Sequence, residues 1–260
     1  MSDYQKAFSL DKKTIFVCGG AGLLGVQVSR AVAACKAKTV ILDVDEDKGK
    51  KLAKELKAHF HYFDLTDLKN LSHSLKDLVK RYKKIDGWAN FSYPKTKDWG
   101  RPTGETLDVD FLKTNVDWQL NSYVVASKAV CEMMKKQKQG GSIVNCGSIY
   151  GLVGNDFTIY PAAEAAAHLP YSVIKGGLVN FTRYLASHAG PYNIRVNCLC
   201  PGGVFDNQDK RFLENYSKKV PLRRLARPQE IASATVFLLS DAASYITGTS
   251  MAVDGGWTAI

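Results

Sequence analysis

The feature that most constrains the fold is a regular alternation of short, β-branched apolar runs with longer amphipathic stretches along the chain. The strand-like runs are Thr14–Cys18, Thr39–Leu42, Phe60–Phe63, Ile85–Phe91, Ser142–Cys146, Arg195–Leu199 and Ser250–Val253. The helix-like stretches are Leu24–Cys35, Glu46–Lys57, Leu68–Tyr82, Phe111–Lys136, Tyr171–Ala189 and Pro228–Leu239. Alternation at this spacing predicts βαβ units, and therefore an α/β fold with a doubly wound parallel sheet.

The domain organisation follows from the absence of any linker-like segment in the sequence. We expect a single domain that spans residues 1–260. Two longer loop-like segments, Ser92–Asp110 and Gly151–Pro170, each follow a strand-like run. They should lie at the carboxyl edge of the sheet, where open α/β sheets bind their ligands.

Composition narrows the classes of function. No apolar run approaches the ~20 residues of a membrane span, and the polar segment Met1–Asp11 lacks the layout of a signal peptide. We therefore expect a cytoplasmic protein with no membrane partner. The formal net charge of +10 comes from lysines that alternate with acids, without a basic stripe interleaved with aromatics, so nucleic acid is not an expected partner. The six cysteines lack paired zinc-ligand spacing, which predicts buried thiols and no metal site.

The turn after the first strand-like run is rich in glycine. Gly20, Gly22 and Gly25 satisfy the spacing G-x-G-x-x-G, which lets a backbone approach a pyrophosphate at a helix N-terminus. Asp43 ends the second run, 18 residues after Gly25. A carboxylate there can accept hydrogen bonds from the adenosine ribose hydroxyls and would repel a 2′-phosphate. The pattern predicts a Rossmann-type fold that binds NAD in preference to NADP.

Two acidic residues near this turn also have structural interpretations. Asp43 could serve as a helix N-cap, a role that Asp45 or Glu46 could fill equally well. Asp64, which closes the third strand-like run, is a candidate for contact with the adenine or a turn residue before Thr66.

Three residues in the second half of the chain predict acid–base chemistry. Tyr171 and Lys175 are four residues apart, hence on one face of the expected helix. A nearby ammonium would stabilise the phenolate and lower the pKa of the tyrosine, which makes it usable as a general acid and base at neutral pH. Ser148 follows the fifth strand-like run, where its hydroxyl could polarise a carbonyl.

Together these motifs resemble those of the short-chain dehydrogenase/reductase family over the whole chain. The shared features are the glycine-rich turn, Asp64, Asn90, Ser148, Tyr171-x-x-x-Lys175, Arg195-Val196-Asn197, the Pro201-Gly202 turn and the ending Asp254-Gly255-Gly256. The resemblance implies NAD(H)-dependent interconversion of a secondary alcohol and a ketone. It also implies a homotetramer in which Phe111–Lys136 and Tyr171–Ala189 pack between subunits.

The resemblance implies a role for each site residue. Tyr171 would be the acid and base, Lys175 would bind the nicotinamide ribose, and Ser148 would hold the substrate oxygen. The relay asparagine of the family aligns with Gln119, while Asn115 lies one turn earlier, so either could hold the relay water. The expected cofactor contacts are Gly19, Gly22, Leu24, Gly25, Asp43, Asp64, Leu65, Asn90, Tyr171, Lys175, Pro201 and Val204.

Departures from the family pattern bear on the substrate. Cys18 replaces the usual threonine, and the glycine spacing resembles the extended branch, so a nucleotide-sugar epimerase or dehydratase is an alternative. A catalytically idle NAD-binding sensor is another. Tyr93-Pro94 and the tail Asp254–Trp257 resemble bacterial flagellin-modification oxidoreductases of surface-sugar biosynthesis, which implies a sugar or sugar-derived substrate. The basic composition would also suit a phosphorylated sugar. The residues expected to contact this substrate are Tyr93, Lys95, Lys97, Arg101, Glu164 and His168. The alternative segment for substrate recognition is Phe205–Val220.

Overall fold

The computed structural model describes residues 2–99, 108–160 and 169–260. Its strands are β1 (Thr14–Cys18), β2 (Lys38–Asp43), β3 (His59–Tyr62), β4 (Gly87–Asn90), β5 (Gly141–Cys146), β6 (Ile194–Pro201) and β7 (Ser250–Val253). They form one sheet in the order β3-β2-β1-β4-β5-β6-β7, and every neighbouring pair is parallel. The predicted single-domain, Rossmann-type, doubly wound sheet is confirmed.

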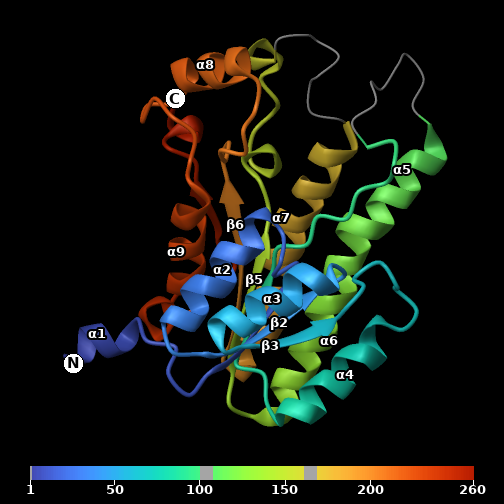
Figure 1. The fold of residues 1–260 in the computed structure, drawn as a ribbon, viewed down its shortest axis with the longest axis vertical. Helices are drawn as coiled ribbons and strands as arrows, with labels where there is room; N and C mark the ends of the chain where they lie inside the picture. The colour runs from blue at the N-terminus through green and yellow to red at the C-terminus, as the bar shows by residue number, and fades with distance from the viewer. Residues whose placement is uncertain (1, 100–107, 161–168) are drawn as a thin grey trace.

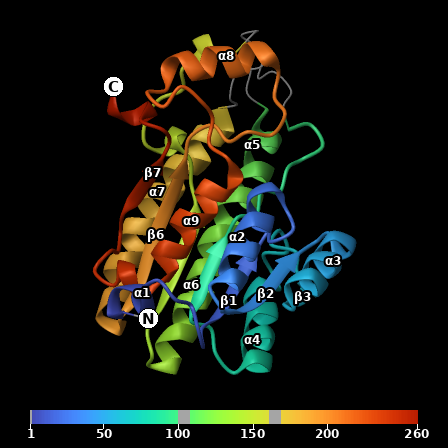
Figure 2. The same cartoon turned by 60° about the vertical axis from the view of Figure 1, so that its left-hand side comes forward.

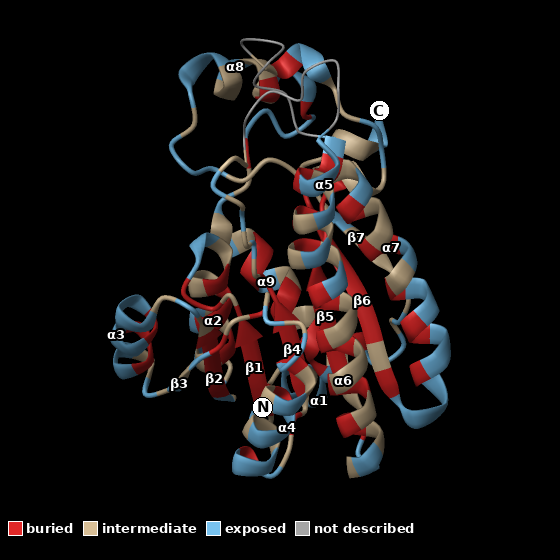
Figure 3. Cartoon of the chain, turned by 90° about the vertical axis from the view of Figure 1, so that its right-hand side faces the viewer, coloured by how far each residue is buried: buried red, intermediate tan, exposed pale blue. Residues whose placement is uncertain are grey.

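Helices cover both faces of this sheet (Figure 1). They are α1 (Asp3–Ala7), α2 (Leu23–Ala34), α3 (Glu46–Leu56), α4 (Leu71–Tyr82), α5 (Val109–Val116), α6 (Ser122–Gln137), α7 (Leu169–Ala189), α8 (Lys210–Lys219) and α9 (Pro228–Leu239). The apolar residues of α2 and α9 pack on one face, and those of α4, α6 and α7 pack on the other. Figure 3 shows the resulting core, with buried residues along the strands and exposed residues on the outer sides of the helices.

The sequence of β1 lacks apolar–polar alternation because the strand is buried on both faces of the sheet. All five residues of β1 are buried. Phe16 packs in the core on the α4, α6 and α7 side, whereas Ile15 and Val17 pack in the core on the α2 and α9 side. A parallel strand covered on both faces needs apolar residues at successive positions, so the run Thr14–Cys18 predicts a central strand.

Two features of the helices differ from the expected pattern. The predicted helix Phe111–Lys136 consists of α5, a π-helical turn at Asp117–Asn121 and α6. The helix α8 was not predicted; its residues Phe212 and Tyr216 belong to a small apolar cluster separate from the two main cores. Figure 2 shows α8 beyond the ends of the strands, above the body of the sheet. Both features lie beside the candidate site.

The cysteines agree with the expectation of buried thiols. All six cysteines are free thiols, and five of them are buried, with Cys35 partly exposed. Among the described residues, no helix combines the length and the apolar character that crossing a membrane requires.

Candidate active site

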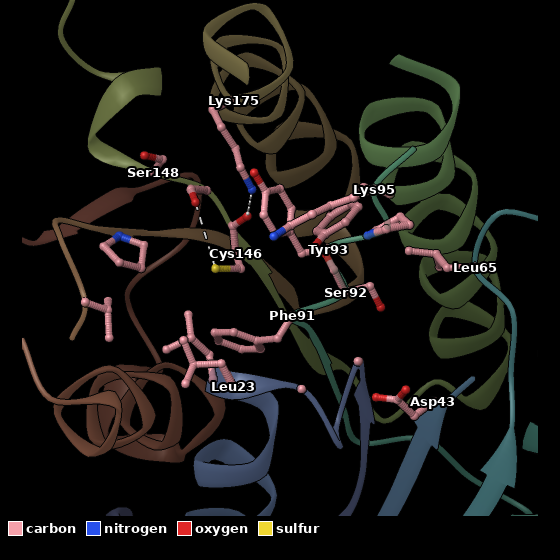
Figure 4. A pocket seen from close by; sticks show the side chains of 18 of the residues that line it. Leu23, Asp43, Leu65, Phe91, Ser92, Tyr93, Lys95, Cys146, Ser148 and Lys175 are labelled. Carbon is pink, nitrogen blue, oxygen red and sulfur yellow. Dashed lines mark hydrogen bonds between the residues drawn. The ribbon is translucent and has the colours of Figure 1, made fainter. Parts of the chain in front are cut away.

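A cavity of about 650 Å³ opens at the carboxyl edge of the sheet. Its lining comes from the ends of six strands, represented by Gly19, Asp43, Asp64, Ser92, Ser148 and Pro201. We call it the main cleft. It spans the position where β1 and β4 lie side by side and the strand order reverses, which is where open α/β sheets bind ligands. Figure 4 shows Asp43 at one end of the main cleft and Ser148 with Lys175 at the other.

The glycine-rich turn shapes the floor of the main cleft. Gly19 has a φ of +69°, and a Cβ added to it would lie 2.5 Å from the backbone nitrogen of Ser92. A Cβ on Gly25 would lie 1.8 Å from the carbonyl oxygen of Gly19. Gly25 therefore lets α2 pack against the turn, and it is not among the residues that line the cleft. Gly22 precedes α2 without a side-chain cap, so the helix presents backbone N–H groups that suit an anion.

Asp43 binds the same turn from the end of β2. Its Oδ2 accepts a hydrogen bond from the Ala21 backbone at 2.8 Å, and its Oδ1 accepts one from the Asp45 backbone at 3.0 Å. The N-cap of α3 is Asp45, which accepts a hydrogen bond from the Lys48 backbone at 3.0 Å. Asp43 is thus not the helix cap, and its carboxylate lines the main cleft.

Asp64 is a turn residue before Thr66, as one interpretation of its sequence position predicted, and its contact with the adenine stays a prediction. Its Oδ1 accepts hydrogen bonds from the backbone and the hydroxyl of Thr66, at 2.8 and 2.7 Å. The carboxylate therefore holds the turn after β3, and Asp64 and Leu65 also line the main cleft.

Ser148, Tyr171 and Lys175 meet at the opposite end of the main cleft, as their sequence spacing indicated. Ser148 follows β5, and its Oγ accepts a hydrogen bond from the Tyr150 backbone at 3.2 Å. The Lys175 side chain is buried, and its Nζ donates to the carbonyl oxygen of Cys146 at 2.9 Å. The same Nζ lies 5.4 Å from the centre of the Tyr171 ring.

The pKa of Tyr171 lies on the opposite side of its ordinary value from the one expected. Burial raises it well above the ordinary value of a tyrosine, and a hydrogen bond with the Ser148 hydroxyl acts in the opposite direction. Burial is therefore the physical reason for the difference. The Lys175 ammonium donates to the Cys146 carbonyl and lies beside the ring of Tyr171, and its effect on the phenolate stays a prediction.

Gln119, Asn115 and Asn90 are buried and do not line the main cleft. Gln119 lies in the π-helical turn, where its Nε2 donates to Asn115 Oδ1 at 3.4 Å. Asn115 Nδ2 in turn donates to the carbonyl oxygen of Phe111 at 2.9 Å. Asn90 Oδ1 accepts from the Ser92 backbone at 3.2 Å and so shapes the turn after β4. Asn90 thus supports the turn from behind the cleft, and the cofactor contacts predicted for Asn90 and Gly25 stay predictions.

A second cavity of about 240 Å³ shares Tyr93, Ser148, Tyr171 and Gly202 with the main cleft. Its other large side chains are Trp99, Tyr150, Tyr160, Phe212 and Tyr216. We call it the aromatic cavity. Apart from Tyr93, these aromatic residues were not predicted individually as site residues, because they come from separate segments without a common motif. The one available signal was the apolar spacing of Phe212 and Tyr216 in the segment after the Pro-Gly turn.

The remaining predicted substrate residues have different positions. Lys95 lines the main cleft, with its Nζ 4.7 Å from the centre of the Tyr93 ring. Lys97 lines neither cavity. Arg101, Glu164 and His168 lie outside the described residues. Within the part of the chain that the structure describes, no group of three or more His, Cys, Asp or Glu side chains could hold a metal ion.

Comparisons with known proteins agree with this architecture. A family model described as enoyl-(acyl carrier protein) reductase matches residues 21–258. Post-translational flagellin modification protein A of Campylobacter coli is 33% identical over 254 residues, covering 95% of this chain and 99% of the relative. Trans-4-hydroxycyclohexanecarboxylate dehydrogenase of Sinomonas cyclohexanicum is 32% identical, covering 95% of this chain and 93% of the relative.

A solved structure extends the comparison to three dimensions. A short-chain dehydrogenase from Leptospira borgpetersenii with bound NAD+ is 29% identical, with a TM-score of 0.85 over 99% of this chain and 96% of that one. The match to the family model covers most of the sequence, and the relatives span nearly its full length. The chain therefore belongs to the short-chain dehydrogenase/reductase family of oxidoreductases.

Proposed function

We propose that this oxidoreductase uses NAD(H) to interconvert a secondary alcohol and a ketone on a sugar or sugar-derived substrate. The observation that carries the proposal is that Ser148 and Tyr171 line both cavities. A dinucleotide in the main cleft and an alcohol in the aromatic cavity would meet at these two hydroxyls. Hydride transfer needs this kind of close, oriented contact between two bound molecules.

The residues of the main cleft fit a nicotinamide dinucleotide. Gly22 and Leu24 line the cleft at the N-terminus of α2, which has no side-chain cap and so suits the pyrophosphate. Asp43 suits the adenosine ribose, and its negative charge favours NAD over NADP. At the other end, Lys175 would bind the nicotinamide ribose, while Pro201 and Val204 line the cleft nearby. The Leptospira protein with bound NAD+ supports this choice of cofactor.

The cofactor would transfer the hydride, and residues of the chain would transfer the proton. The nicotinamide, when bound, accepts or supplies the hydride. The Tyr171 hydroxyl would exchange the proton with the substrate oxygen, and Ser148 would hold that oxygen through a second hydrogen bond. Gln119 is the better candidate for the proton relay, because its Oε1 is buried without a partner among the described residues, whereas the side-chain amide of Asn115 is hydrogen bonded on both sides.

The sugar assignment rests on the Campylobacter relative, which is named for flagellin modification. The Sinomonas relative is named for a six-membered ring that carries both a hydroxyl and a carboxylate, and its hydroxyl supports a cyclic secondary alcohol more generally. The proposal includes a cytoplasmic homo-oligomer, with a tetramer expected from the family. The exposed apolar side chains of Val173 and Tyr184 on α7 support such an interface, and light scattering of the purified protein measures the assembly.

The experiment is a search for dehydrogenase activity with both cofactors. We expect NADH to form, followed at its absorbance maximum, when the protein is given NAD+ and a panel of cyclic secondary alcohols and sugars. Tyr171→Phe should bind NADH and form none. Activity that persists in Tyr171→Phe, or that depends on NADP+ alone, would overturn the proposal.

A further inference from the structure

We propose that the aromatic cavity selects an uncharged, ring-shaped secondary alcohol and discriminates against phosphorylated, carboxylated and nucleotide-linked rings. This inference rests on the proposed function and adds the class of substrate. It also replaces the phosphorylated substrate that the basic composition had suggested, since the described lysines nearest the site do not line this cavity.

The ring of Tyr171 packs against other aromatic rings. The Tyr93 ring lies 6.0 Å from the Tyr171 ring at an interplanar angle of 76°, and the Tyr150 ring lies 6.5 Å from it at 84°. The Trp99 ring is 5.9 Å from the Tyr93 ring at 86°. Edge-to-face pairs of this kind are favourable, so the rings hold one another in place. The space beside the Tyr171 hydroxyl is therefore bounded by flat apolar surfaces.

The far wall of the cavity is equally well supported. Phe212 and Tyr216 on α8 lie with their ring centres 5.8 Å apart, and Trp257 stacks on Tyr216 at 4.7 Å and 21°. The Tyr216 hydroxyl accepts a hydrogen bond from the Gly203 backbone. A Cβ on Gly203 would lie 2.7 Å from the Tyr216 ring. Glycine after the Pro-Gly turn thus allows α8 to bring its aromatic face over the site.

The described lining of the cavity disfavours an anion. None of the described residues that line it carries a charged side chain. Lys95 faces the main cleft, and Lys219, on the outer part of α8, pairs with Asp156 at 3.0 Å. Burial also raises the pKa of Tyr150 well above its ordinary value, so the neutral phenol is the favoured form there. A phosphate or carboxylate placed there would lose its hydration without gaining a cation, which is strongly unfavourable.

The polar groups that remain suit hydroxyls. Ser148 and Tyr171 supply one pair, and the hydroxyls of Tyr150 and Tyr160, 3.4 Å apart, supply another. Each of these groups can donate or accept a hydrogen bond. A ring with one hydroxyl at Tyr171 and a second near Tyr150 would satisfy both pairs, while its C–H faces pack on the aromatic side chains. Apolar walls with a few placed polar groups are typical of small-molecule sites.

The first test compares neutral rings with related rings that carry a negatively charged group. Cyclohexanol and cyclohexane-1,2-diol are compared with trans-4-hydroxycyclohexanecarboxylate, and a hexose is compared with its 6-phosphate. We expect kcat/KM for the neutral members to exceed that of the charged members at least tenfold. Equal or higher kcat/KM for the charged members would overturn the proposal, while leaving the NAD-dependent oxidation itself intact.

Binding without turnover gives an independent readout. In Tyr171→Phe saturated with NADH, neutral rings should change the tryptophan fluorescence, and additional Trp99→Phe should remove most of that change. The charged members should produce at least tenfold weaker binding. If no neutral ring binds, or if the charged rings bind as tightly, the proposed selectivity is wrong whatever the catalytic result.

A charged residue in place of Phe212 tests whether the lining of the aromatic cavity determines the preference for neutral rings. Phe212→Arg introduces a cation into the cavity and should shift the ratio of kcat/KM at least tenfold towards the carboxylate. Phe212→Leu is the matched control, because it stays apolar and should keep the preference for neutral rings. An unchanged ratio in Phe212→Arg, in a variant with normal NADH affinity and thermal stability, would contradict the role of this wall.

Discussion

The buried ammonium of Lys175 donates a hydrogen bond to the carbonyl oxygen of Cys146 at 2.9 Å, which joins α7 to the last residue of β5. Ser148 lies two residues beyond that carbonyl, and Tyr171 lies one turn before Lys175 on α7. The bond therefore fixes the distance between the two elements that carry the candidate catalytic hydroxyls. A cation held in this way has both a structural and a chemical role.

Loss of Lys175 should weaken catalysis and cofactor binding together. Lys175→Met keeps the length of the side chain and removes the charge, the bond to Cys146 and the expected contact with the nicotinamide ribose. We expect kcat to fall by about 10²–10⁴-fold, the range typical of acid–base assistance, and the Kd for NADH to rise. Lys54→Met on the exposed face of α3 is the control and should change neither. A Lys175→Met variant with normal kcat would exclude the assigned role.

The raised pKa of Tyr171 predicts how the rate depends on pH. Because the pKa is above its ordinary value, the phenol is protonated at neutral pH, and the basic form needed for alcohol oxidation is a minor species. The rate of oxidation should therefore rise by up to about tenfold per pH unit from pH 6 to 9, while ketone reduction should decline at the alkaline end. Steady-state kcat/KM in both directions measures this. An oxidation rate that is flat over the whole range would mean that another group accepts the proton.

Asp43 should control the choice between the two dinucleotides. Asp43→Asn removes the charge but retains an oxygen that can accept the hydrogen bond from the Ala21 backbone. We expect this variant to narrow the difference in Kd between NADH and NADPH by about tenfold or more, with little loss of stability. Asp43→Ala also removes the bond to the turn and should weaken the binding of NADH further. Equal affinity of the unmodified protein for both dinucleotides would refute the assignment.

Gly25 should be essential to the turn for steric reasons. In Gly25→Ala, the new Cβ would collide with the carbonyl oxygen of Gly19 at 1.8 Å, so α2 must move away from the turn. We expect a lower Tm and a clearly higher Kd for NADH. Gly190→Ala is the control, because nothing lies within 4 Å of its added Cβ, and it should leave both values nearly unchanged. Differential scanning fluorimetry and NADH titration measure the pair.

The fold could be predicted from the sequence because local pattern and global packing agree. The run Thr14–Cys18 is apolar at every position, and only a central strand covered on both faces uses such a run. The positions of Gly22, Asp43 and Ser148 at one edge of the sheet then follow from the parallel order of the strands. Tyr171 and Lys175 follow from helical spacing alone.

The parts that could not be predicted depend on contacts between distant segments. Phe212, Trp99 and Tyr150 meet in one cavity only because the turn at Gly203 brings α8 over the carboxyl edge. The direction of the Lys175 ammonium is set by the position of a backbone carbonyl on β5, which spacing on α7 does not reveal. For the same reason, the sequence did not reveal that Lys95 lines the main cleft while Lys97 lines neither cavity.

The central claim is that Tyr171 takes the proton from a secondary alcohol whose hydride passes to NAD+. The most direct measurement gives the protein cyclohexanol, or the best substrate of the panel, carrying deuterium at the carbinol carbon. Mass spectrometry of the reduced cofactor then reports the origin of the hydride. The account predicts one deuterium per NADH formed by the unmodified protein and no reduced cofactor above background with Tyr171→Phe. Two results would contradict this claim directly: reduced cofactor without deuterium, or equal deuterium transfer by Tyr171→Phe. A third contradicting result is that no member of the panel transfers deuterium, which would favour an idle NAD-binding sensor.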